Sequence, residues 1–74
     1  MIPTPPKHWP QPDGTAVSCR EKLRVLAENH AELAQMLQDA FDDAVLMGVD
    51  GEAFRSVLID VVRALETPKR SGSD

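Results

Sequence analysis

The fold is decided by a short stretch between two helical patterns, residues 44–52, with the sequence AVLMGVDGE. Gly48 suits the left-handed position that follows a helix, and Val49 behind it can pack back on the last turn. Asp50 is a preferred N-cap residue, and Glu52 places a negative charge in the first turn of a new helix. A connection of two or three residues makes the flanking helices antiparallel neighbours.

A long amphipathic helix is predicted before this corner. Ser18 and Glu21 have the S-x-x-E spacing of a capping box. No proline or glycine follows until Gly48. The apolar pattern steps by four and three residues, a heptad repeat of about four heptads. It consists of Cys19, Leu23, Leu26, His30, Leu33, Leu37, Ala40, Ala44 and Met47. We predict a helix over about residues 18–47, roughly 43 Å long.

A second, shorter helix is predicted after the corner, over about residues 51–66. Thr67-Pro68 ends it, because the residue before a proline disfavours helical backbone. Its apolar side chains recur at helical spacing: Phe54, Val57, Leu58, Val61, Val62 and Leu65. The predicted fold class is therefore all-α, an antiparallel helical hairpin.

The chain ends are predicted to be irregular. Five of the first twelve residues are prolines, and Asp13-Gly14 follows as a turn signal. Prolines remove backbone donors, so polyproline II or disorder is expected there. The predicted organisation is a flexible arm over residues 1–17, a hairpin domain over 18–67 and a flexible tail over 68–74.

The unequal helix lengths predict an interface. The second helix, roughly 24 Å long, covers only about half of the first and leaves the stripe from Cys19 to His30 exposed. A fold of about 50 residues also needs a source of stability besides its small core, such as a disulfide or a partner. The single cysteine excludes an internal disulfide. The predicted partner-binding residues are Leu23, Leu26, His30 and Leu33, with Trp9 of the arm.

Two alternatives would cover the stripe within one chain. The arm could fold back and lay Trp9 over Leu23 and Leu26. The long helix could instead break near Asn29-His30 and form a three-helix bundle.

The charge distribution favours self-association. Basic residues cluster at the start of the long helix (Arg20, Lys22, Arg24) and acidic residues near its end (Asp39, Asp42, Asp43). This order opposes the helix dipole. An antiparallel homodimer would place each basic end beside an acidic end and form a four-helix bundle.

Cys19 and His30 are the residues with chemical potential. A cysteine at a helix start, beside Arg20 and Lys22, is a candidate reactive thiol, although Cys19 also fits the apolar stripe. The two residues lie ~16 Å apart on one helix, too far to share an ion. No metal site or cofactor is therefore predicted. A metal- or redox-responsive sensor using Cys19 and His30 is the alternative function.

Several function classes are disfavoured. The net charge of −4 argues against binding nucleic acid or an anionic membrane, so a DNA-binding regulator is the least favoured hypothesis. No apolar run approaches the ~20 residues of a membrane span. The first residues lack signal-peptide features, which predicts a cytoplasmic protein. No catalytic motif is present, so no enzyme is predicted. The leading hypothesis is an accessory or regulatory interaction module that binds itself or a larger assembly.

Overall fold

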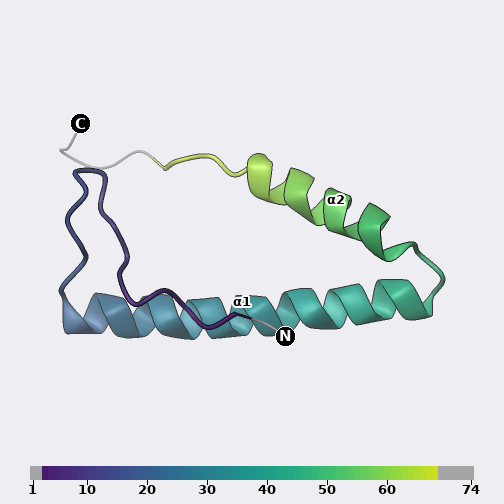
Figure 1. Cartoon of the computed structure of the whole chain (residues 1–74), viewed down its shortest axis with the longest axis horizontal. Coiled ribbons are helices and arrows are strands. Elements are labelled where there is room, and N and C mark those ends of the chain that lie inside the picture. Colours follow the sequence, from purple (N-terminus) through teal and green to yellow (C-terminus); the bar gives the residue numbers. More distant parts are fainter. Residues whose placement is uncertain (1–2, 69–74) are drawn as a thin grey trace. The chain divides into compact units, whose positions relative to one another are not determined.

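The computed structural model describes residues 3–68, and the regular secondary structure of these residues is helical apart from one isolated β-bridge. Helix α1 spans Arg20–Leu46 and helix α2 spans Gly51–Arg63 (Figure 1). This confirms the predicted all-α class with two helices that pack against each other. The chain divides into two compact units, Met1–Ala40 and Phe41–Asp74. The predicted tail lies outside the described residues except for Pro68.

The corner between the helices is a Schellman motif, as residues 44–52 predict. Gly48 has φ 101°. Its N–H donates to the Val45 carbonyl at 3.0 Å, and the Val49 N–H donates to the Ala44 carbonyl at 2.9 Å. These two bonds satisfy carbonyls that the end of a helix leaves without partners.

Helix α2 begins as predicted and ends three residues early. The Asp50 carboxylate accepts a hydrogen bond of 2.9 Å from the Ala53 N–H, which confirms the N-cap. At the other end, the Leu65 N–H donates to the Val62 carbonyl at 3.2 Å. This tighter i to i−3 bond replaces the α-helical one, so the predicted end near Glu66 is wrong and Leu65 lies outside the helix.

A small aromatic cluster holds α2 against the end of α1 within the second unit. The rings of Phe41 and Phe54 have centroids 6.3 Å apart at an angle of 55°. The Arg55 guanidinium lies 4.8 Å from the Phe41 centroid, a cation–π geometry. Gly51 faces the same ring, because a Cβ built on it would lie 3.2 Å from Phe41 Cζ. Ala44, 4% exposed, is the one residue of the described chain that is buried.

Helix α1 begins at Arg20 with Cys19 as its N-cap, so the capping box predicted at Ser18 is wrong. The Cys19 carbonyl accepts the first helical bond, from the Leu23 N–H at 3.0 Å. The chain is still paired with the arm one residue before Ser18, since the Val17 N–H donates to the Trp9 carbonyl at 2.8 Å.

Residues 9–17 of the arm form a closed turn, so the prediction of polyproline II or disorder is wrong for this segment. Pro10 and Ala16 form an antiparallel bridge. Gly14, at φ 92°, donates to the Gln11 carbonyl at 2.8 Å. The Asp13 carboxylate accepts the Thr15 hydroxyl at 2.7 Å and the Thr15 N–H at 3.0 Å. These two bonds lower the pKa of Asp13. The Asp13-Gly14 turn signal thus outweighs the prolines.

Candidate interaction surface

The arm contacts α1 through Trp9. Its ring meets His30 edge-on, with centroids 6.5 Å apart and an interplanar angle of 72°. The fold-back alternative therefore describes part of the structure, with His30 as the ring partner where Leu23 and Leu26 had been expected. Since α1 is continuous from Arg20 to Leu46, the alternative of a break near Asn29-His30 is wrong.

The first unit leaves one flank of α1 exposed. We call this the open flank and define it as Leu33, Met36 and Leu37, which are 57%, 67% and 39% exposed. The predicted partner-binding residues Leu23, Leu26 and His30 are only half-buried, as is Trp9, whereas Leu33 is open. The structure thus places Leu33 with Met36 and Leu37, and it places Trp9 against His30.

The other flank of α1 is the one that the arm approaches. We call it the arm flank and define it as Leu23, Ala27, His30 and Ala34, all half-buried. In heptad terms these residues occupy a and e positions, while Leu33, Met36 and Leu37 occupy d, g and a. Sequence reasoning missed Met36 because a g position lies outside the a/d stripe.

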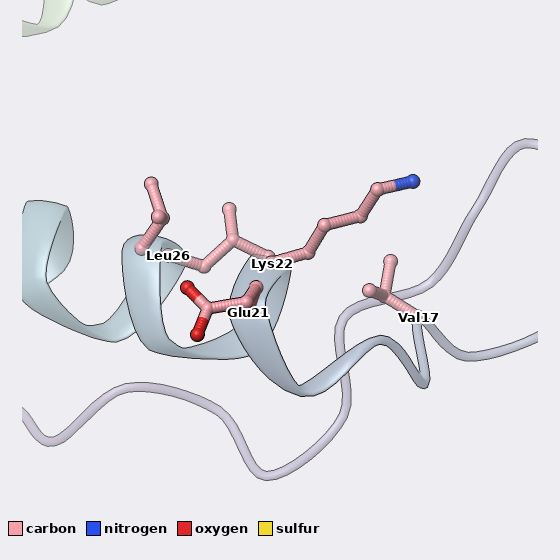
Figure 2. A pocket seen from close by; sticks show the side chains of 5 residues that line it. Val17, Glu21, Lys22 and Leu26 are labelled. Carbon is pink, nitrogen blue, oxygen red and sulfur yellow. The ribbon is translucent and has the colours of Figure 1, made fainter.

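A shallow apolar notch lies at the start of α1. Its volume is about 370 Å³, and it is lined by Val17, Glu21, Lys22, Val25 and Leu26. Figure 2 shows Val17, at the base of the arm, beside the extended stem of Lys22, with Leu26 one turn further along α1. The Lys22 stem adds apolar surface while its ammonium reaches water. The notch continues the apolar surface of α1 toward its basic end.

Helix α2 also carries exposed apolar side chains. Phe54 and Leu58 are half-buried, whereas Val57, Val61 and Val62 are 54–61% exposed. Leu65, beyond the helix, is 75% exposed. Of the predicted apolar stripe of α2, only Phe54 and Leu58 are partly covered, and Leu65 lies beyond the end of the helix.

The charged residues of α1 differ in their pairing. Arg24 bonds to Glu21 at 2.8 Å and to Glu28 at 3.0 Å, with all three side chains more than half exposed. Such exposed pairs contribute little stability. Within residues 3–68, no ion pair involves Lys22 or Asp43.

Cys19 is exposed, as a reactive thiol requires. The backbone N–H groups of Lys22 and Glu21 donate toward its sulfur and lower the pKa of the thiol. This is the effect of a helix N-terminus on a thiolate. The position of Cys19 at the N-cap favours the thiolate. The sequence predicted a reactive thiol here from a helix that starts one residue earlier, at Ser18.

Among residues 3–68, no three His, Cys, Asp or Glu side chains are grouped so that they could hold a metal ion. No helix in this range is long and apolar enough to cross a membrane. No protein-family model, curated protein or solved structure matches the chain.

Proposed function

We propose that this chain is a non-catalytic helical interaction module that associates with itself and serves as an accessory or regulatory subunit. One observation carries the proposal: the described residues expose large apolar side chains almost everywhere and bury only Ala44. The exposed residues are Val25, Leu33, Met36, Leu37, Val45, Leu46, Met47, Val49, Val57, Ile59, Val61, Val62 and Leu65.

Extended apolar patches on small proteins mark interaction sites. A standard interface removes about 800 Å² from each partner.

Self-association is favoured over a different partner by the charge pattern of α1. Three basic residues lie near its start and three acidic residues near its end. A second copy reversed against the first would complement this pattern without any other protein. A homodimer of two helical hairpins is also a common route to a four-helix bundle.

The test is the solution mass of the purified chain, measured by light scattering and by sedimentation equilibrium. The protein concentration is varied from about 1 µM to about 200 µM, which covers micromolar dissociation constants. Leu33→Asp should yield a monomer because it places a charge on the open flank. Leu46→Asp is the matched control, since Leu46 is 84% exposed and lies off the a/d stripe. A wild-type chain that stays monomeric throughout would refute self-association. Circular dichroism confirms that each variant keeps its helices.

A redox-responsive role for Cys19 is the second candidate. It is favoured by the exposure of the thiol and by the two backbone N–H groups directed at its sulfur. The role predicts that native Cys19 reacts faster than the same thiol in the unfolded chain at neutral pH. Equal rates in the two states would remove the support for this candidate.

A further inference from the structure

We propose that the second copy binds the open flank of α1 in a defined antiparallel register, in which Lys22 of each chain pairs with Asp43 of the other. This inference rests on the proposed self-association and specifies its geometry. It follows from which flank of α1 is free, which charges lack partners and how the heptad positions match.

The free flank decides the side of approach. The arm contacts α1 through Trp9 and His30, and the residues of the arm flank are half-buried. The open flank exposes Leu33, Met36 and Leu37 by 39–67%. A second copy can therefore approach α1 from its d and g edge and share the a positions, of which His30 also contacts Trp9 of the arm.

The heptad pattern then restricts the register. In an antiparallel pair, an a residue of one helix lies opposite a d residue of the other, and g residues face each other along one edge. When His30 lies opposite Leu33 of the second copy, Leu26 meets Leu37 and Leu23 meets Ala40. This register pairs the apolar positions of α1 from Leu23 to Ala40, short of Ala44, which is buried within its own chain.

The same register brings opposite charges together. Lys22 and Asp43 both occupy g positions. The register places Lys22 of each chain opposite Asp43 of the other chain. Neither residue has an ion-pair partner within residues 3–68. Shifting one chain by a heptad in either direction keeps the a-to-d alternation but moves Lys22 away from Asp43. The charges therefore select one register among those that the apolar stripe permits.

Charge reversal tests the register. Lys22→Asp and Asp43→Lys should each weaken the dimer by about tenfold or more, because two attractive pairs become repulsive. The double variant Lys22→Asp/Asp43→Lys should recover wild-type affinity, and so should an equimolar mixture of the two single variants. Asp60→Lys, on α2, is the control that changes charge equally without touching the g edge.

Cross-linking tests the same register without altering charge. In a Cys19→Ser background, Leu26→Cys mixed with Leu37→Cys should form a disulfide-linked heterodimer under mild oxidation, because a disulfide requires Cβ atoms about 3.5–4.5 Å apart. Leu33→Cys mixed with Leu37→Cys, which would pair after a one-heptad shift, should not. Wild-type Cys19 should not cross-link to its counterpart, since the two lie at opposite ends of the dimer.

The outcomes separate the two proposals. A monomeric wild-type chain refutes self-association and the register with it. A dimer that tolerates both single charge reversals, or that cross-links through Leu33→Cys and Leu37→Cys, keeps self-association and overturns the register. A dimer that cross-links readily through native Cys19 is parallel and overturns the register as well.

Discussion

Replacing Gly48 by alanine should destabilise the hairpin through backbone strain alone. Gly48 has φ 101°, beyond the left-handed region that an L-residue reaches at a cost of roughly 1–2 kcal/mol. A Cβ at this position would meet no heavy atom within 4 Å, so no steric clash adds to the cost. We expect Gly48→Ala to lower the free energy of unfolding by about 1–2 kcal/mol, and hence the Tm by about 4 °C or more for a domain of this size.

A synthetic chain with D-alanine at position 48 provides the decisive comparison. A D-residue favours positive φ, and it reduces the entropy of the unfolded chain, so this variant should gain about 0.4–1 kcal/mol over wild type. Unfolding is followed by circular dichroism in urea at one fixed protein concentration, because association makes stability depend on concentration. If L-alanine and D-alanine at position 48 gave the same stability, the assignment of Gly48 to the left-handed position would be refuted.

Three further results are expected. Asp50→Ala should lower the free energy of unfolding by about 1 kcal/mol because it removes the bond to the Ala53 N–H. Asp60→Ala, in the last turn of α2, should cost less, and an equal loss would contradict the cap. Alkylation of Cys19 by iodoacetamide should have a pH midpoint below the ~8.5 of a free thiol, because backbone N–H groups lower the pKa of Cys19. The midpoint should return toward that value in about 6 M guanidinium, which unfolds even stable domains. His30→Ala should increase the acrylamide quenching of Trp9, the single tryptophan, by removing its edge contact; unchanged quenching would show that the arm is held elsewhere.

The corner was predictable because its signals are local. Gly48 and Asp50 each act on backbone groups within four residues, at the Val45 carbonyl and the Ala53 N–H. The capping box at Ser18 uses equally local rules and failed. Its position depends on the arm, whose Trp9 carbonyl binds the Val17 N–H from eight residues away. Sequence spacing carries no information about that bond.

The exposure of the site residues was predicted only in part. The heptad stripe placed Leu23, Leu26, His30 and Leu33 on the exposed half of the seam. In the structure Leu33 is open, as predicted, whereas the other three are half-buried. For His30, Trp9 of the arm lies against the ring, and a proline-rich segment gives no periodic signal from which such a contact could be inferred.

The arm and the proposed second copy approach α1 from opposite edges and meet at its a positions. The sequence presented them as alternatives, because either one would cover the exposed stripe. The contact of Trp9 with His30 places the arm at an a position of α1, while Leu33, Met36 and Leu37 remain exposed. Removal of the arm should therefore expose additional apolar surface without removing the proposed interface.

The charge order of α1 gives the proposed self-association a physical reason. The helix has no basic residue in its last turn, and Arg20, Lys22 and Arg24 lie near its start, where the dipole disfavours positive charge. This order destabilises an isolated helix. In an antiparallel pair, the basic start of each helix lies beside the acidic end of the other. The two helix dipoles then also run antiparallel, which is favourable. An arrangement that is unfavourable in the monomer thus becomes favourable in the dimer. Since the charges are exposed, we expect the dissociation constant to rise as salt shortens the Debye length from ~10 Å at 0.1 M to ~3 Å at 1 M, and a constant that ignored salt would contradict this role for the charges.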